Sequence, residues 1–382
     1  MIALTASALL TPLERVEQPI LLLEGDQIVR LSSRISEEIP AGARLIDFGD
    51  AIIAPGFVDI HNHGGAGRDV MEADSAALPA IEKLLLSHGV TGYLPTTVTA
   101  PLDRTLEALH RLADAIDTAA EPGRARPLGI HIEGPFLSHV RRGVHPPEHL
   151  LPPTVEVFDK MWQAARGHIR LMTIAPELDG AFDVVTEAVR RGVTVSIGHS
   201  DADLNTARAA VDAGARHATH TFNAMQPFSH RDPGIIGEVL TDSRITADII
   251  ADGVHTDPSV VKLFLQAKGA EKAVLITDST AATGMPDGRY KMGAFEFEVI
   301  DGKCMAHGVL AGSVLTLDRA ARNVMQFADW DLDRAVRSAS LNPAAAAGLT
   351  NKGEIKAGAS ADLIVLTPSG EVQTTIVAGA GI

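Results

Sequence analysis

The sequence predicts a TIM-like (β/α)8 barrel with a small β-sandwich domain built from both ends of the chain. Three observations lead to this fold class. Strand-like and helix-like segments alternate through the middle of the chain, both ends are rich in strand patterns, and 382 residues suffice for a large core and a second small domain. We therefore expect the barrel at 55–352 and the sandwich at 1–54 together with 353–382.

The expected barrel strands are short apolar runs, most of which end in polar residues. Their ranges are 56–61, 90–98, 128–134, 169–176, 193–199, 217–222, 245–253 and 273–278. Helix-like segments fill most of the gaps, at 76–89, 104–117, 182–192 and 204–214. An open doubly wound sheet is the alternative. No strand is followed by the G-x-G-x-x-G fingerprint of that fold, and the glycines at 64–67 lack its spacing.

Strand patterns at both ends of the chain indicate the small domain. Residues 20–31 read as two strands around a turn at Gly25 and Asp26, and strand-like sequence continues at 45–53. Near the other end, 361–366 and 371–379 have the same character.

A long insertion follows the last expected barrel strand. Residues 295–306 alternate between apolar and polar around Asp301 and Gly302, a dipeptide that favours a tight hairpin. We expect a β-hairpin insertion around 285–310, at the catalytic end of the barrel. A moving lid and a static rim are both open interpretations.

The composition excludes several classes of protein. Lys and Arg number 33 and Asp and Glu number 48, so the net charge is 33 − 48 = −15, which disfavours binding to nucleic acid or to an anionic membrane. Cys304 is the only cysteine, so neither an intramolecular disulfide nor a multi-thiolate zinc site can form. No apolar run reaches 18 residues, and the apolar N-terminal stretch lacks a basic leader region. We expect a cytoplasmic enzyme.

Six side chains suited to metal binding or proton transfer come at the ends of five expected strands. Each alone has an ordinary structural explanation, such as a core imidazole or a helix cap. In a barrel, however, the carboxyl ends of the strands meet on one rim, which is where such enzymes place their chemistry. Imidazoles and carboxylates that converge there predict a divalent-metal site. The six residues are His61, His63, Glu133, His199, His220 and Asp278.

This pattern resembles the amidohydrolase superfamily, with His-X-His on strand one, His on strands five and six, and Asp on strand eight. Strand four, RLMTIAPE, has no Lys that could be carbamylated to bridge two metals, and strand five does not continue into the HAxE pattern of adenosine deaminases. The motifs HIEGPF, RRGVH, IGHS, THTFNAM, DGVH, TDS and LAGS, in this order, closely resemble the N-acetylglucosamine-6-phosphate deacetylase family over essentially the whole chain.

The resemblance implies a role for each matching residue. Glu133 would bridge one or two divalent ions of zinc, iron, manganese or cobalt. Asp278 would be the general acid and base, and His145 would polarise the substrate carbonyl. The other implied metal ligands are His61, His63, His199 and His220, and the implied substrate contacts are Asn223, Ala224, Arg231, His255 and Leu310.

The implied reaction is hydrolysis of the acetamide of N-acetylglucosamine 6-phosphate to glucosamine 6-phosphate and acetate, in amino-sugar catabolism and cell-wall recycling. Arg231 would be donated by the neighbouring subunit of a homodimer. Arg141 and Arg142 are expected to be solvated, and His217 to be a packing or surface residue. The alternatives are a deacetylase of N-acetylgalactosamine 6-phosphate and, less favoured because all six positions are present, a catalytically dead barrel.

Overall fold

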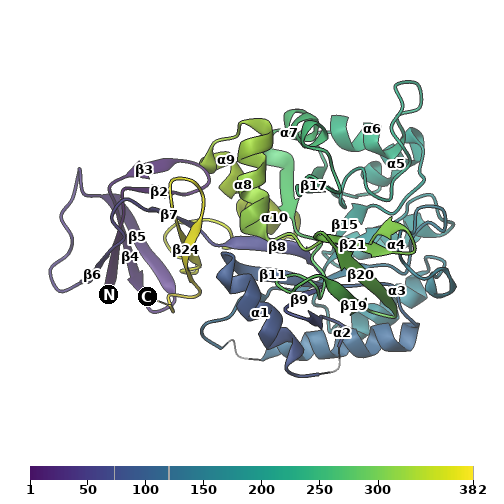
Figure 1. Ribbon diagram of the computed structural model, residues 1–382, viewed down its shortest axis with the longest axis horizontal. Helices are drawn as coiled ribbons and strands as arrows, with labels where there is room; N and C mark the ends of the chain where they lie inside the picture. The colour runs from purple at the N-terminus through teal and green to yellow at the C-terminus, as the bar shows by residue number, and fades with distance from the viewer. Residues whose placement is uncertain (73, 119–120, 382) are drawn as a thin grey trace.

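The largest sheet is a nearly closed parallel barrel, seen at the centre of the computed structural model (Figure 1), which describes residues 1–72, 74–118 and 121–381. Neighbouring barrel strands are parallel. The last strand, β18 (Ala273–Ile276), returns to the first, β8 (Phe57–Asn62). At this junction, the Asp278 N–H donates to the His61 carbonyl at 3.0 Å, and the His63 N–H donates to the Ser279 carbonyl at 2.9 Å. The predicted barrel is confirmed. Its strands are β8 (Phe57–Asn62), β11 (Val90–Thr97), β13 (Ile130–Glu133), β14 (Ile169–Ile174), β15 (Thr194–Ile197), β16 (His217–Ala218), β17 (Thr246–Ile250) and β18 (Ala273–Ile276).

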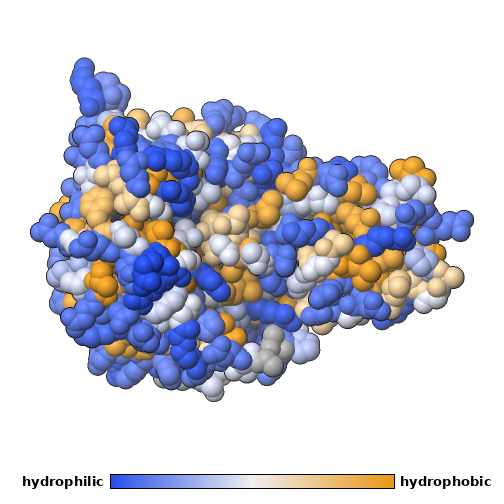
Figure 2. Space-filling view, turned by 180° about the vertical axis from the view of Figure 1, so that it is seen from behind, coloured by the Kyte–Doolittle hydropathy of each residue, from blue (hydrophilic) through white to orange (hydrophobic). Residues whose placement is uncertain are grey.

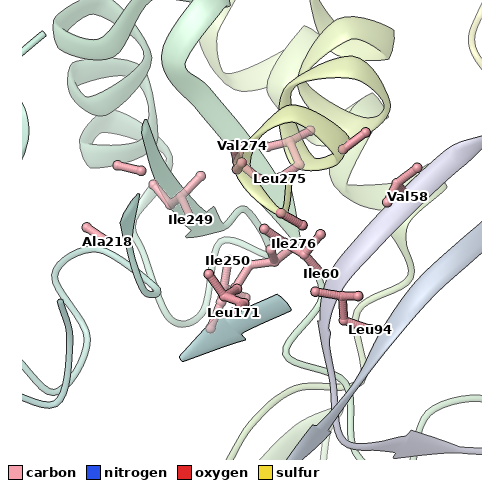
Figure 3. Close-up of a cluster of buried hydrophobic side chains, with 14 of the residues drawn as sticks. Val58, Ile60, Leu94, Leu171, Ala218, Ile249, Ile250, Val274, Leu275 and Ile276 are labelled. Atoms are coloured by element: carbon pink, nitrogen blue, oxygen red, sulfur yellow. The ribbon is translucent and has the colours of Figure 1, made fainter. Parts of the chain in front are cut away.

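Helices cover the outside of this barrel and close its main core. The strands and the helices share one buried cluster of Val, Ile, Leu, Phe and Ala side chains, part of which is drawn in Figure 3. Asp203 and Thr154 begin two of the helices by accepting hydrogen bonds from backbone N–H groups. The helices are α1 (Ala77–Ser87), α2 (Leu102–Asp117), α3 (Val155–Ala164), α4 (Ala181–Arg190), α5 (Leu204–Asp212), α6 (Gly234–Thr241), α7 (Pro258–Lys272), α8 (Leu317–Ala328), α9 (Leu332–Ala339) and α10 (Leu341–Ala346), with a short 3-10 turn at Pro147–His149.

Two mixed sheets at the termini lie to one side of the barrel, where both chain ends are marked in Figure 1. One sheet has the order β5-β4-β1-β6 and the other β24-β23-β7-β2-β3, and a separate buried cluster joins side chains from both. The apolar N-terminal stretch therefore forms strands inside this unit. The strands are β1 (Ile2–Thr5), β2 (Ala8–Leu10), β3 (Arg15–Glu17), β4 (Pro19–Glu24), β5 (Gln27–Ser33), β6 (Arg44–Asp47), β7 (Ile52–Pro55), β23 (Leu363–Leu366) and β24 (Val372–Ile376).

The insertion after β18 is a four-stranded antiparallel sheet, β19 (Gly288–Met292), β20 (Phe295–Ile300), β21 (Lys303–Ala306) and β22 (Val309–Leu310). Asp301 and Gly302 join β20 to β21 with φ values of 51° and 71°, the left-handed pair that a tight hairpin turn requires. The sheet is larger than one hairpin, because β19 pairs with β20 before this turn and β22 pairs with β21 after it. Short strands also form at Gly64–Gly65 (β9), Arg68–Asp69 (β10) and Arg126–Pro127 (β12).

The surface of the barrel is mostly hydrophilic, whereas apolar residues gather over the terminal sheets in the view from behind (Figure 2). Among the described residues, none of the helices combines the length and apolar character that a bilayer crossing needs.

Candidate active site

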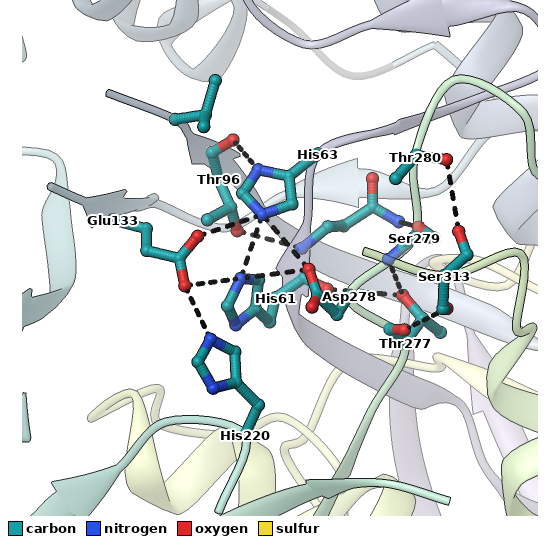
Figure 4. A network of polar contacts seen from close by, with 12 residues as sticks. His61, His63, Thr96, Glu133, His220, Thr277, Asp278, Ser279, Thr280 and Ser313 are labelled. Carbon is teal, nitrogen blue, oxygen red and sulfur yellow. Dashed lines mark hydrogen bonds and ion pairs between the residues drawn. The ribbon is translucent and has the colours of Figure 1, made fainter. Parts of the chain in front are cut away.

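The six predicted residues converge at one end of the barrel, as Figure 4 shows for those labelled there. All of them are buried, and five line a cavity of about 330 Å³ together with His145; His61 lies behind His63. Convergence follows from strand direction, because parallel strands end at the same rim. Asn223, Ala224, His255 and Leu310 also line this cavity.

Glu133 lies at the centre of the cluster and contacts imidazoles on two sides. Its Oε2 is 3.2 Å from His63 Nε2, and its Oε1 is 3.4 Å from His61 Nε2. On the other side, Oε1 is 3.2 Å from His199 Nε2 and 3.0 Å from His220 Nε2. One carboxylate therefore faces both histidine pairs, which is the arrangement of a bridging ligand.

Asp278 faces only one of these pairs. Its Oδ1 lies 3.2 Å from His63 Nε2 and 3.5 Å from His61 Nε2. Since this carboxylate lines the open cavity, it can also reach a substrate atom there.

The hydrogen bonds at Nδ1 differ between two predicted metal ligands, His63 and His199, and His145. His63 Nδ1 lies 3.0 Å from the Thr96 carbonyl, and His199 Nδ1 lies 3.0 Å from the Arg141 carbonyl. A carbonyl can only accept, so each Nδ1 donates and leaves a lone pair on Nε2 for a metal. His145 Nδ1 instead accepts from Thr99 N at 3.3 Å, so its Nε2 carries a proton.

The donor set fits a divalent cation. Nε2 atoms of His61 and His63 are 3.1 Å apart, and those of His199 and His220 are 3.0 Å apart. Two lone pairs cannot hydrogen-bond each other, so each pair needs a proton or a cation between its members. Imidazole and carboxylate are the ligands that zinc and similar metals prefer. By distance alone His145 groups with Glu133 and His199, but its protonated Nε2 makes it a donor rather than a ligand.

Both carboxylates are ionised at neutral pH. Burial raises the pKa of Glu133, but the charge on His61 and hydrogen bonds from the other imidazoles outweigh it and hold the pKa well below its usual range. Burial also opposes ionisation of Asp278, yet the charges of His61 and His63 lower its pKa to about 2. Burial lowers the pKa of His199 to about 4, so this ring is neutral and able to bind a metal. Burial disfavours charge on His63 and His220 as well, but in the absence of a metal, hydrogen bonds and charges of Asp278 and Glu133 raise the pKa of His63 to about 10, and Glu133 raises the pKa of His220 to about 9. A metal ion would displace the protons from these two rings.

Three of the six clustered residues adopt left-handed backbone conformations. The φ values are 47° for His199, 30° for His220 and 49° for Asp278. Such conformations cost about 1–3 kcal/mol each in a residue other than glycine and persist only where the surroundings hold them. The backbone around Asp278 is held on both sides, because its N–H donates to His61 and its carbonyl accepts from Ser313 N at 2.7 Å.

A layer of polar side chains lies beneath the cluster and was not predicted from the sequence. His131 Nε2 is 2.8 Å from Thr173 Oγ1, which is 2.8 Å from Thr219 Oγ1. Thr173 and Thr219 belong to strands that are not neighbours, so this contact crosses the barrel interior. A signal was present for His131, because it precedes Glu133 by two residues and residues two apart share a face of a strand.

Asp248 supports the metal ligand His220 from this layer. Its Oδ1 accepts a hydrogen bond from His220 N, and its Oδ2 lies 2.9 Å from Nε2 of the fully buried His217. His217 is therefore a packing residue with a specific partner. Asp248 holds the strained backbone of His220 in the position from which its ring faces Glu133.

We expect Asp248→Asn to weaken metal binding without removing a ligand. The amide keeps the volume but loses the charge that holds His220 N and His217, and changes next to a ligand typically reduce metal affinity 10–100-fold. Competition with a chromogenic chelator measures this affinity. Asp329→Asn, which changes an exposed side chain, is the matched control; equal affinities of the two variants would contradict the supporting role.

The three arginines considered from the sequence lie on two different loops. Arg231 is on an exposed loop and does not line the cavity. Arg141, expected to be solvated, lines the cavity and donates to Asp201 Oδ1 at 2.7 Å. Arg142 donates to the His145 carbonyl at 3.0 Å. The expectation for Arg141 was therefore wrong, since this residue lines the cavity, whereas Arg142 is partly exposed and does not line it.

Comparison with known proteins agrees with this geometry. A model of the amidohydrolase family matches residues 52–381. The chain belongs to this family. It is 38% identical over 349 residues to N-acetylglucosamine-6-phosphate deacetylase of Bacillus subtilis (strain 168), covering 90% of this chain and 86% of that protein. N-acetylgalactosamine-6-phosphate deacetylase of Escherichia coli O157:H7 is 37% identical over 330 residues, covering 86% and 87%.

A solved structure is similar over nearly the whole chain. It is an aspartate-to-alanine mutant of N-acetyl-D-glucosamine-6-phosphate deacetylase from Mycobacterium smegmatis, in complex with N-acetyl-D-glucosamine-6-phosphate. The TM-score is 0.93 at 36% identity, with 99% of this chain and 98% of that chain covered. The family resemblance inferred from the motifs is thus confirmed.

Proposed function

We propose that this amidohydrolase removes the acetyl group of N-acetylglucosamine 6-phosphate, giving glucosamine 6-phosphate and acetate. The observation that carries the proposal is Glu133 between two histidine pairs, with Asp278 and His145 facing the same cavity. Relatives of this name match at up to 38% identity, and the similar M. smegmatis structure contains this sugar phosphate.

We assign metal binding to five clustered side chains, those of His61, His63, Glu133, His199 and His220. A divalent ion held there would polarise the amide carbonyl and lower the pKa of water from ~16 towards ~7. Glu133 would be shared between the sites, His199 and His220 would complete one, and His61 and His63 the other.

We assign proton transfer to Asp278 and hydrogen-bond donation to His145. Ionised Asp278 accepts the proton of the attacking water and then delivers it to the departing amine, which leaves poorly unless it is protonated. His145 donates through Nε2–H to the carbonyl oxygen as negative charge develops on it, because Thr99 holds the ring in the required tautomer. One such donor contributes about 3–4 kcal/mol to the transition state.

A panel of four sugars tests the proposal. Acetate release is measured on N-acetylglucosamine and N-acetylgalactosamine, each with and without the 6-phosphate. We expect the highest kcat/KM on N-acetylglucosamine 6-phosphate. Preference for the galactose epimer would favour the alternative that the E. coli O157:H7 relative represents, and no acetate release by the metal-loaded protein would refute both.

The phosphate of this substrate needs a cation in an otherwise acidic protein, and we propose that Arg141 supplies one. Among the described residues that line the cavity, Arg141 alone carries a Lys or Arg charge. Its backbone carbonyl also holds His199, an interaction that a side-chain substitution leaves in place.

We expect Arg141→Gln to raise KM for the phosphorylated sugar about tenfold with little change in kcat, because a charge-assisted contact to a group remote from the amide is lost. Steady-state kinetics on both forms of the sugar measures the effect. The unphosphorylated sugar is the internal control, and an equal loss on both forms would contradict phosphate recognition.

We further propose a homodimer in which Arg231 enters the neighbouring active site. Its position on an exposed loop outside the cavity of its own chain supports this arrangement. Exposed Phe228 on the same loop offers apolar surface for a contact between subunits. Asn223 and the backbone of Ala224, which line the cavity, would complete the phosphate site, and His255 and Leu310 would contact the sugar.

Mixing two defective variants tests the shared site. Arg231→Gln lacks the donated arginine, and Asp278→Asn lacks the acid–base group. In a heterodimer, one site has an intact Asp278 and receives Arg231 from its neighbour. In a 1:1 mixture about half of the dimers are heterodimers, each with one intact site. At low substrate we therefore expect activity from about a quarter as many sites as in the wild type. Activity equal to the mean of the separate variants would contradict donation between subunits.

We also propose that residues 1–54 and 353–382 form a β-sandwich domain beside a barrel at 55–352. The buried cluster shared by the two terminal sheets supports this division. We propose in addition that the insertion is a fixed wall of the cavity rather than a moving lid. Two observations support this: Met292, Val309 and Leu310 line the cavity, and Phe297 and Val299 pack with barrel residue Val98. We also propose that the enzyme works in the cytoplasm, which a sugar phosphate substrate supports.

A further inference from the structure

A second cavity, of about 750 Å³, is lined by residues of α1, α2 and the segment at 121–128 that precedes β13. Helices α1 and α2 are in the lower part of Figure 1. It shares none of its described lining residues with the active-site cavity. Its volume falls in the range of sites for small organic ligands. One part of its wall is apolar and consists of Leu78, Leu112, Ile116 and Leu128.

Two arginines on this wall lack a negatively charged partner. Arg111 donates from Nη2 to the Met71 carbonyl at 2.8 Å, while its Nε is buried without a hydrogen-bond partner. Arg126 Nε is also buried and unpartnered. Within the described residues, neither guanidinium has a carboxylate at ion-pair distance. An arginine cannot lose its proton, so each guanidinium keeps a positive charge at the cavity wall, and its terminal N–H groups are those that a ligand would contact.

Acidic residues at the same cavity do not fill this need, because they are paired elsewhere. Asp114 pairs with Arg166 at 2.7 Å, and Glu121 pairs with Arg124 at 2.8 Å. The remaining acids are likewise paired. Glu82 contacts Arg124 and the Tyr93 hydroxyl, and Glu72 and Asp74 both pair with Arg68.

We propose that this cavity binds a small organic anion with an apolar body and one phosphate or carboxylate group. Arg111 and Arg126 would bind the charged group, since a guanidinium presents parallel N–H donors that match two oxygens of either group. The apolar body would pack on the leucine and isoleucine wall. This site is separate from the proposed catalytic one and does not depend on the reaction assigned there.

The test is isothermal titration of the metal-loaded enzyme with three probes that share a ring system: 1-naphthyl phosphate, 1-naphthoate and the neutral 1-naphthalenemethanol. Because the catalytic cavity could also bind a phosphate, the site is assigned from variants. Arg111→Gln and Arg126→Gln remove the proposed ligands. Arg104→Gln, in the same helix as Arg111 but exposed and paired with Glu107, is the matched control.

We expect at least one of the two anionic probes to bind, with Kd raised roughly tenfold or more in both cavity variants and unchanged in the control. Comparison of the two anions shows whether phosphate or carboxylate is preferred. Turnover by all variants should remain at the wild-type level, which also verifies folding. If Arg126→Gln does not fold, Arg126→Lys, which keeps the charge but loses the parallel N–H donors, should still raise Kd relative to the wild type.

Three results would overturn the proposal. One is that neither anion binds the wild-type enzyme. Another is that an anion binds all variants equally. The last is that the neutral alcohol binds as tightly as the anions, which would make the cavity an apolar site only.

Discussion

Asp278→Asn should lower kcat by roughly 10³-fold, within the range that a general acid–base group contributes. The reason is that one carboxylate accepts a proton from water and then donates it to the amine, and an amide can do neither at neutral pH. The low pKa of Asp278, about 2, means that the wild-type group is ionised and ready to accept. Acetate release under saturating substrate measures the change.

This variant must be distinguished from one that has lost the site. We expect Asp278→Asn to bind metal and substrate as the wild type does, because five other side chains surround the metal positions. Metal content by elemental analysis and substrate affinity by titration measure these properties. Asp329→Asn, at an exposed position, should have wild-type kinetics. Near-normal kcat in Asp278→Asn would remove the acid–base assignment.

The second large effect is expected for Glu133→Gln, which should lose the metal bound between the two histidine pairs. Glu133 is within 3.4 Å of all four metal-binding imidazoles, so its negative charge attracts whatever cation lies between them. An amide of the same size leaves the imidazoles in place without that charge. Since a catalytic metal is worth several kcal/mol, we expect activity to fall at least about 10³-fold.

Metal content separates this effect from simple misfolding. Glu133→Gln should fold, as judged by circular dichroism, yet contain less than half the metal of the wild type. His61→Asn should lose only the ion on its own side if two ions bind. Chelation of the wild type should abolish activity, and added divalent metal should restore it. Glu133→Gln with wild-type metal content and turnover would contradict the bridging role.

Much of the site could be predicted because its residues are tied to strand ends. His61, Glu133, His199 and Asp278 each follow an apolar run, and parallel strands end at one rim whatever the details of packing. The role of His145 came only through family resemblance, because it lies on a loop with no periodic pattern. The tautomer that makes it a donor depends on Thr99, 46 residues away in the chain.

The polar layer beneath the metal cluster escaped prediction for a different reason. Asp248 and Thr219 look like ordinary polar interruptions of strands, and their meaning depends on which strands face each other across the barrel. Arg141 was misjudged in the same way. Basic residues on a loop are usually solvated, and only the folded loop shows that its carbonyl holds His199 and its side chain faces the cavity.

The six residues at the strand ends, and the barrel that brings them together, could be predicted from the sequence alone, because hydrophobic periodicity and the alternation of strands and helices can be read along the chain. Tertiary structure shows which carboxylate faces both histidine pairs and which histidine has its Nδ1 turned towards an N–H donor. It also revealed that Arg111 and Arg126 face a cavity without a carboxylate partner. These depend on hydrogen bonds and charges between residues far apart in the chain, and no local pattern encodes such partners.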